Sequence, residues 1–174
     1  LRITKSIGSF IQKDVPLQDK SWFQTGGNAE FYCAPTTTTE FKDAIIFAEE
    51  NSLEIFILGK GANILISDEG FSGLVIHPQL TTTEYHIKDN QHLVTAGSGT
   101  DFEDLINYCL KHQLSGLEEF SGIPSTVGGA TYINLHYYEF LLSDFFVEGT
   151  IINKETGETK TVPKEWFNFG YDQS

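Results

Sequence analysis

The sequence has 174 residues, of which 40% are hydrophobic and 13% aromatic, enough to form the core of one domain or two small ones. Eleven Lys and Arg residues against 24 Asp and Glu give a formal net charge of −13, which argues against binding to a nucleic acid or an anionic membrane, since both require a basic surface. An anionic ligand would have to be held by backbone N–H groups and helix N-termini rather than by a lysine cluster.

The cysteine content and the hydropathy pattern favour a reducing compartment. The two cysteines, Cys33 and Cys109, form neither a disulfide framework nor a closely spaced metal motif. No apolar run approaches the roughly 20 residues of a membrane span, and residues 1–8 lack the apolar run of a signal peptide. The histidines show no metal-ligand spacing. We therefore expect a cytoplasmic protein without a metal site or a membrane partner.

The first third of the chain predicts a β-α-β unit. Residues 29–34 are typical of a strand, and residues 40–51 carry apolar side chains at the spacing of an amphipathic helix, which Thr39 can cap. Three further apolar segments are predicted as strands: residues 54–58, 64–67 and 74–76. A glycine-rich loop over residues 59–63 (Gly-Lys-Gly-Ala-Asn) joins the first two of these strands.

The remainder of the chain is richer in strands. Hairpins are predicted over residues 82–96, turning at Asp89-Asn90, and over residues 149–162, turning at residues 155–157. Between them a helix begins at Thr100, where Thr100 and Glu103 have the spacing of a capping box. A second glycine-rich loop follows over residues 121–130. The summed pattern is α+β, with a boundary near residues 76 and 77.

The two glycine-rich loops match no common phosphate-binding motif. Neither has the spacing of a Walker A loop or of a dinucleotide fingerprint. Residues 59–63 combine two glycines with an Asn, which tolerate positive φ and let a backbone approach a ligand closely. Residues 121–130 add three glycines, hydroxyl groups and N–H donors that could surround a phosphate or a flat ring. From these residues alone, two plain connections are an equally good interpretation.

Seven segments occur in the order and spacing of one enzyme family. They are Ser-Trp-Phe-Gln-Thr-Gly-Gly at 21–27, Ile-Leu-Gly-Lys-Gly-Ala-Asn-Ile-Leu at 57–65, and residues 67–75, 96–99, 116–119, 121–130 and 169–171. In these segments the chain resembles the UDP-N-acetylenolpyruvoylglucosamine reductases, also called UDP-N-acetylmuramate dehydrogenases, flavoenzymes that complete UDP-N-acetylmuramate in peptidoglycan synthesis. Each motif is weak by itself, and the ordered set is specific.

The resemblance implies a fold and a cofactor. The fold is the α+β FAD-binding fold of vanillyl-alcohol oxidase and p-cresol methylhydroxylase, in which two subdomains, here residues 1–76 and 77–174, clamp FAD. The pyrophosphate of non-covalently bound FAD is expected on one set of residues: Gly59, Lys60, Gly61, Ala62, Asn63 and Ile64. The rest of the cofactor is expected along a second set: Ser121, Gly122, Pro124, Ser125, Thr126, Gly128, Gly129 and Ala130.

The resemblance also implies an activity. NADPH would reduce the flavin, which would pass a hydride to the enolpyruvyl group of a nucleotide-sugar substrate, in a monomer. The family's substrate-binding domain, with its serine proton donor and a glutamate, is expected beyond residue 174, so residues 1–174 alone are predicted to be inactive.

Three departures bear on catalysis. The family commonly has Tyr-Arg-x-Ser where this sequence has residues 171–174, so Tyr171 and Ser174 are candidate catalytic residues but Asp172 replaces the arginine. An Asp repels a substrate carboxylate that a guanidinium would bind. Residues 134–139 replace the usual Asn-Ala-Gly-Ala-Tyr-Gly, and Gln24 replaces an arginine.

Two functions therefore remain open. The chain is either the FAD-binding part of a reductase of this family, or an FAD-binding module or inactive homologue that has lost the chemistry. An oxidase of the same superfamily is a distant third, because its covalent flavin attachment leaves no mark in the sequence.

Overall fold

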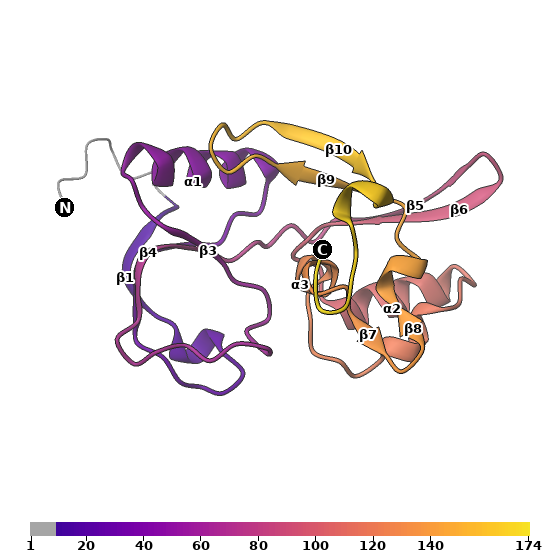
Figure 1. The fold of residues 1–174 in the computed structure, drawn as a ribbon, viewed down its shortest axis with the longest axis horizontal. Helices are drawn as coiled ribbons and strands as arrows, with labels where there is room; N and C mark the ends of the chain where they lie inside the picture. Colours follow the sequence, from indigo (N-terminus) through magenta and orange to yellow (C-terminus); the bar gives the residue numbers. More distant parts are fainter. Residues whose placement is uncertain (1–9) are drawn as a thin grey trace. The chain divides into compact units, whose positions relative to one another are not determined.

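The computed structural model describes residues 10–174, which form two compact units (Figure 1). Unit 1 comprises the residues up to Leu80 together with Ile152–Lys160, and unit 2 comprises Thr81–Ile151 together with Thr161–Ser174. Residues 1–8, considered above for a signal peptide, lie outside the described residues.

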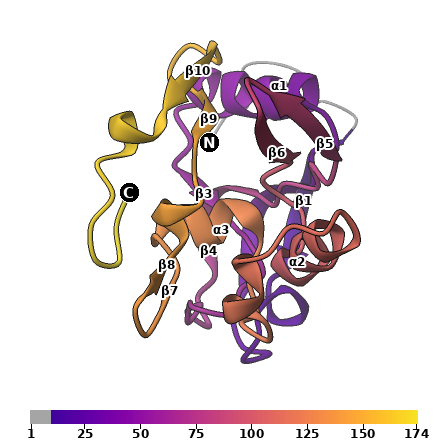
Figure 2. The same ribbon diagram turned by 90° about the vertical axis from the view of Figure 1, so that its right-hand side faces the viewer.

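Unit 1 is built on a four-stranded sheet in the order β1-β2-β4-β3. Its elements are β1 (Gln12–Pro16), the short 3-10 helix η1 (Gln18–Lys20), β2 (Asn28–Cys33), α1 (Thr38–Glu50), β3 (Ile55–Ile57) and β4 (Phe71–Ile76). β1 is antiparallel to β2, whereas β2 and β3 both run parallel to β4. The predicted β-α-β unit is therefore confirmed, and α1 covers one face of the sheet (Figures 1 and 2).

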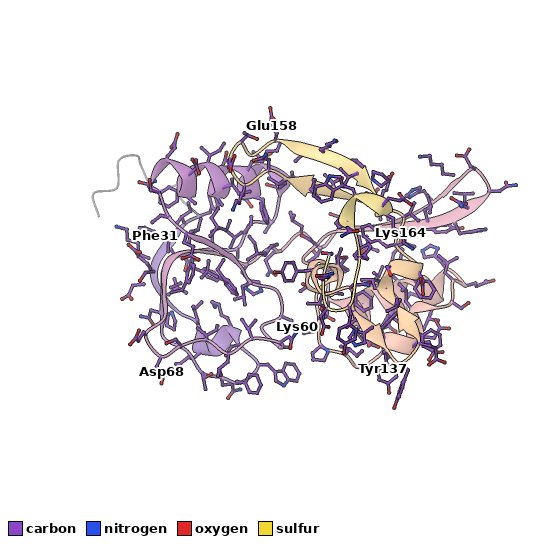
Figure 3. All side chains as sticks on the ribbon, in the orientation of Figure 1. Phe31, Lys60, Asp68, Tyr137, Glu158 and Lys164 are labelled. Carbon is purple, nitrogen blue, oxygen red and sulfur yellow. The ribbon has the colours of Figure 1, made fainter. Side chains whose placement is uncertain are left out.

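The core of unit 1 lies between α1 and the sheet. Phe31 of β2 meets Phe47 of α1 edge to face, with ring centroids 5.5 Å apart, and Figure 3 labels Phe31 in this layer. Leu74 and Ile76 of β4 share this cluster, while Val75 belongs to a second cluster on the other face of the sheet. This alternation is what a strand buried on both faces produces.

The start of α1 corrects the predicted cap. The N-cap is Thr37, whose Oγ1 accepts from the N–H of Glu40 at 3.2 Å, so Thr39 lies inside the helix. The Glu40 carboxylate accepts in return from the N–H and hydroxyl of Thr36, at 2.7 and 2.9 Å. These bonds hold the pKa of the Glu40 carboxyl below its usual value. Among four successive threonines, the one that stands three residues before a Glu becomes the cap.

The predicted strand over residues 64–67 is wrong. This segment belongs to no strand, and the Leu65 side chain is 78% exposed. β3 and β4 are parallel neighbours, so the chain must travel back along the sheet between them, and the segment that does so has no strand to pair with. Its fixed point is the carbonyl of Ser67, which accepts from the N–H groups of Gly27 and Gly70 at 2.8 and 2.9 Å.

Unit 2 contains two helices, short 3-10 segments and hairpins. Its elements are β5 (Thr83–Lys88), β6 (Gln91–Ala96), α2 (Phe102–Lys111), η2 (Leu117–Phe120), α3 (Val127–Tyr132), β7 (His136–Tyr137), β8 (Phe140–Leu141), η3 (Leu142–Asp144), β9 (Glu148–Ile152), β10 (Thr159–Pro163) and η4 (Lys164–Phe167). Both predicted hairpins are confirmed, and Asp89 and Asn90 adopt the positive φ of a tight turn. The β9–β10 hairpin is divided between the units, because residues 152–160 cluster with unit 1.

The core of unit 2 lies on the apolar face of α2. Phe102, Leu105, Ile106 and Cys109 pack with residues of the following segments: Phe120, Ala130, Leu135 and Leu142. Within residues 10–174 no helix is both long and apolar enough to cross a membrane.

The predicted capping box at Thr100 is also wrong. α2 begins at Phe102, and its cap is Asp101, whose Oδ1 accepts from the N–H of Glu103 at 3.1 Å. Thr100 instead closes a turn, because its N–H donates to the Gly97 carbonyl at 3.0 Å, and its own carbonyl accepts from the N–H of Val127 at 2.9 Å. The Thr100 hydroxyl is buried and has no hydrogen-bond partner among the described residues. The backbone bond between Thr100 and Val127 thus takes precedence over the capping box expected at Thr100. The Glu103 side chain bonds to Ser121 and Gly122 instead.

Candidate cofactor-binding loops

The first loop, residues 59–64, packs against the segment that follows η1. The N–H of Trp22 donates to the Gly61 carbonyl at 3.0 Å. Gly61 has a φ of +66°, and a Cβ at this position would lie 2.4 Å from the carbonyl oxygen of Lys20. Only glycine fits here, for reasons internal to unit 1. The loop lies at the end of unit 1 opposite α1, where Figure 3 labels Lys60.

The backbone of this loop carries unused donors. Five backbone N–H groups have no acceptor within residues 10–174. They belong to Gly59, Gly61, Ala62, Asn63 and Ile64. Successive unpaired N–H groups around a residue with positive φ form a concave site for an anion. This arrangement suits a phosphate group in a protein whose net charge is −13.

In the second loop, residues 121–130, most backbone N–H groups donate to acceptors within unit 2. Its internal bonds are Ser121 N–H to Glu118 O, Gly122 N–H to Glu103 Oε2, Ile123 N–H to Phe120 O, Val127 N–H to Thr100 O, Gly128 N–H to Ser98 O, Gly129 N–H to Thr126 Oγ1, and Ala130 N–H to Thr126 O. Pro124 has no N–H, and among the other residues of this loop only Ser125 and Thr126 have N–H groups without an acceptor in the described residues. The Ser125 hydroxyl donates to the Thr126 carbonyl at 3.0 Å.

The end of this loop is a helix, which corrects the prediction of a loop through Ala130. α3 begins at Val127 and is capped by Thr126. Gly128 lets it approach a neighbouring turn, because a Cβ there would lie 3.0 Å from the Cβ and from the carbonyl oxygen of Ser98. Ala130 is buried in the core of unit 2. The glycines of this segment therefore serve packing as well as turning.

Glu103 organises the second loop although no sequence pattern indicates this role. The Glu103 carboxylate, in the first turn of α2, accepts from the Ser121 hydroxyl and from the Gly122 N–H. The sequence signal at Glu103 indicated a cap, and no local pattern connects it with residues 121 and 122.

The C-terminal segment is anchored by Asn134. This buried side chain donates through Nδ2 to the Gly170 carbonyl at 3.0 Å and accepts through Oδ1 from the Ser143 N–H at 3.0 Å. The Ser174 hydroxyl donates to the Tyr132 carbonyl at 3.1 Å. Residues 170–174 are thereby held against the end of α3.

Two departures from the family pattern lie against each other. His136 Nδ1 is 3.7 Å from Asp172 Oδ1, and the ring of Tyr171 lies 4.6 Å from the His136 ring. The structure thus brings Tyr171 and Asp172 together at His136, while Ser174 is engaged elsewhere. An imidazole beside this carboxylate offsets part of its negative charge whenever the ring is protonated.

The cysteines offer no nucleophile. Burial raises the pKa of the Cys33 thiol to about 12 and raises that of Cys109 as well, so both remain thiols near neutral pH. Within the described residues no group of three or more His, Cys, Asp or Glu side chains gathers as a metal site would require.

Comparisons with known proteins identify the kind of domain. A family model described as "FAD binding domain" matches residues 29–162. The UDP-N-acetylenolpyruvoylglucosamine reductase of Staphylococcus carnosus is 34% identical over 164 residues, which cover 94% of this chain and 52% of the relative. The crystal structure of this reductase from Thermus caldophilus superposes with a TM-score of 0.77 at 26% identity, covering 94% of this chain and 57% of that one.

A more distant structure shows the fold alone. A VAO-type flavoprotein from Myceliophthora thermophila superposes with a TM-score of 0.62 at 15% identity, covering 78% of this chain and 26% of that one. The predicted α+β FAD-binding fold is therefore confirmed. The chain spans about half the length of the curated relatives it matches.

Proposed function

The chain belongs to the FAD-binding-domain family, and we propose that it binds FAD non-covalently as the FAD-binding part of a UDP-N-acetylenolpyruvoylglucosamine reductase. The observation that carries this proposal is the set of N–H groups of Gly59 and residues 61–64 that have no acceptor among the described residues. FAD has two phosphates, and backbone donors can hold them in a strongly acidic protein without a lysine cluster. Bound FAD would supply the capacity for hydride transfer.

The roles of the two loops differ in this proposal. Residues 59–64 bind the pyrophosphate through their N–H groups. In the second loop the free N–H groups of Ser125 and Thr126 are the cofactor contacts, and Pro124 offers an apolar surface beside them. Ser121, Gly122, Gly128, Gly129 and Ala130 shape this loop through the internal bonds and packing described above. The subdomain boundary between residues 76 and 77 stays a prediction.

The remaining parts of the proposal concern the whole enzyme. NADPH is the reductant, the enolpyruvyl nucleotide sugar is the substrate, and the protein is a cytoplasmic monomer that serves peptidoglycan synthesis. Residues 1–174 alone should bind FAD without turning over the substrate, because the relatives are about twice as long. After anaerobic reduction of the flavin, added enolpyruvyl substrate should not reoxidise it. Reoxidation by residues 1–174 would refute this part.

Flavin binding is tested at Asn63, an exposed residue of the first loop. Asn63→Asp keeps the side-chain shape but places a negative charge beside the proposed pyrophosphate site, which should weaken FAD binding about tenfold or more. Asn90→Asp is the matched control, because Asn90 lies at a hairpin turn whose positive φ Asp tolerates. Flavin fluorescence titration of the apoprotein measures both affinities. Equal affinities for the two variants would remove the pyrophosphate from this loop.

The second function, an FAD-binding module without reductase activity, is favoured by the contact between Asp172 and His136. A chimera joining residues 1–174 to the remaining part of the Staphylococcus carnosus relative distinguishes the two. If the chimera binds FAD but is inert with NADPH and substrate, Asp172→Arg should restore turnover only together with His136→Gly, because an arginine alone would face the imidazole. Activity of the unaltered chimera would exclude the inactive-module function.

A further inference from the structure

The carboxylate of Glu103 bridges the start of α2 and the start of the second loop. The Ser121 hydroxyl lies 3.1 Å from each Glu103 oxygen, and the Gly122 N–H donates to Glu103 Oε2 at 3.0 Å. All three groups belong to unit 2. Hydrogen bonds to an ionised carboxylate are about twice as strong as bonds between neutral groups. These bonds connect the start of the loop to another element through a side chain.

The beginning of the loop needs such a connection. Gly122 has a φ of +82°, and no heavy atom lies within 4 Å of the position a Cβ would take, so neighbouring atoms do not fix this turn by packing. The N–H groups of Ser121 and Ile123 donate only to residues of η2, just before the loop. The end of the loop, by contrast, is bonded to Ser98 and Thr100.

A simpler role for Glu103 would be to offset the helix dipole of α2. Asp104 stands in the same first turn and carries the same charge, but no hydrogen bond joins it to the loop among the described residues. Asp104 therefore allows the two roles to be distinguished. Both acids can interact with the helix dipole, but only Glu103 contacts the loop among the described residues.

We propose that Glu103 is a positioning residue for FAD binding: it fixes the turn at Gly122, the start of the loop. Together with the bond from the Phe102 N–H to the Ser125 carbonyl and the bridge between Asp101 and Thr126, it holds the free N–H groups of Ser125 and Thr126 in place before the cofactor arrives. In this assignment Ser121 and Gly122 are anchors rather than cofactor contacts, because their donors already serve Glu103. The inference rests on the proposed function. Pre-ordering a loop improves affinity by reducing the entropy lost on binding.

Two substitutions and a matched control test the assignment. Glu103→Ala should weaken FAD binding about tenfold, corresponding to about 1.4 kcal/mol, while Asp104→Ala should change it less than about twofold. Glu103→Gln should recover part of the loss, because the amide oxygen keeps one acceptor. Flavin fluorescence titration of residues 1–174 measures all four affinities, wild type included.

Hydrogen exchange without cofactor gives a readout that does not depend on FAD. The amide of Gly122 should exchange faster in Glu103→Ala and at the wild-type rate in Asp104→Ala. If Glu103→Ala fails to fold, Ser121→Ala removes the hydroxyl partner while leaving the charge, and should show a smaller loss of affinity and the same direction of exchange.

The outcomes separate the two proposals. Wild-type protein that binds no FAD overturns the proposed function, while the exchange rates still decide whether Glu103 anchors the loop. Wild-type binding with equal affinities for Glu103→Ala and Asp104→Ala overturns the positioning role, and so does an unchanged exchange rate at Gly122. Recovery by Glu103→Gln supports it.

Discussion

The two glycine-rich loops look alike in sequence and differ in how their backbones are bonded. The N–H groups of Gly59 and of residues 61–64 find no acceptor among the described residues, whereas in residues 121–130 nearly all N–H groups are bonded within unit 2. A glycine-rich sequence therefore does not by itself indicate an anion site. What distinguishes a binding loop is the number of donors left over once the fold is formed.

The difference follows from what surrounds each loop. The first loop leaves β3 and crosses back towards β4, and in the part of the chain that the structure describes no strand pairs with it to accept the N–H groups of Gly59 and residues 61–64. The second loop is paired with residues 100–102, through the bridge between Asp101 and Thr126 and the bond from the Val127 N–H to the Thr100 carbonyl. One loop is open to a ligand, and the other is a structural element with two free donors.

The largest effect is expected at the glycines with positive φ, one in each loop. Gly61→Ala places a Cβ against the Lys20 carbonyl at 2.4 Å, so unit 1 should lose more than about 3 kcal/mol of stability, and flavin with it. Gly122→Ala meets no atom within 4 Å and carries only backbone strain, about 1–2 kcal/mol. Urea unfolding and flavin content measure both. Similar losses would show that the loops do not differ as described.

Hydrogen exchange tests the comparison without mutation. Amides of Gly59 and of residues 61–64 should exchange within minutes in the apoprotein and slow down at least about tenfold on adding FAD, because the cofactor supplies the missing acceptors. Amides of residues 127–130 should be protected before FAD is added, since their acceptors are internal. Inorganic pyrophosphate at high concentration should protect the first set alone. Protection of Gly59 and residues 61–64 without ligand would contradict the description of their N–H groups as unpaired.

Much of the fold could be predicted from the sequence because it depends on local signals. The helix over residues 38–50, the hairpin turning at Asn90 and the second helix follow from periodicity and turn residues. The errors occur where tertiary pairing decides. Residues 64–67 have a strand's composition but no neighbouring edge, and Thr100 has a cap's spacing but pairs with Val127.

The site could be predicted in outline only. The resemblance brought both loops to attention, but the division of donors between ligand and protein depends on contacts far apart in sequence. Glu103 and Gly122 are such a pair, and so are His136 and Asp172. Each departure from the family pattern was visible in the sequence, and their contact was not.

The smallest effect that we expect is a dependence of the stability of unit 1 on pH, through His77. His77, in unit 1, is paired with Tyr32, whose hydroxyl lies 2.8 Å from His77 Nδ1. Burial raises the pKa of Tyr32 to about 12, so the hydroxyl keeps its proton near neutral pH. Burial, and next the charge of Lys20, lower the pKa of His77 from its usual 6.5, because both disfavour the protonated ring.

The sign of the pH dependence follows from this shift. Below pH 6.5 His77 binds a proton in the unfolded chain but stays neutral in folded unit 1, because its pKa is lowered there. The contribution of His77 to stability is therefore fully present above pH 6.5. It decreases as the pH falls towards the folded pKa, by at most about 1.4 kcal/mol per pH unit. His77→Asn keeps an acceptor for Tyr32 and removes the titration, so unfolding followed at unit 1 should lose most of this slope. Trp22 belongs to unit 1 and Trp166 to unit 2, so Trp166→Phe leaves a fluorescence signal from unit 1 alone. An unchanged slope in His77→Asn would place the acid sensitivity elsewhere in the unit that carries the open loop.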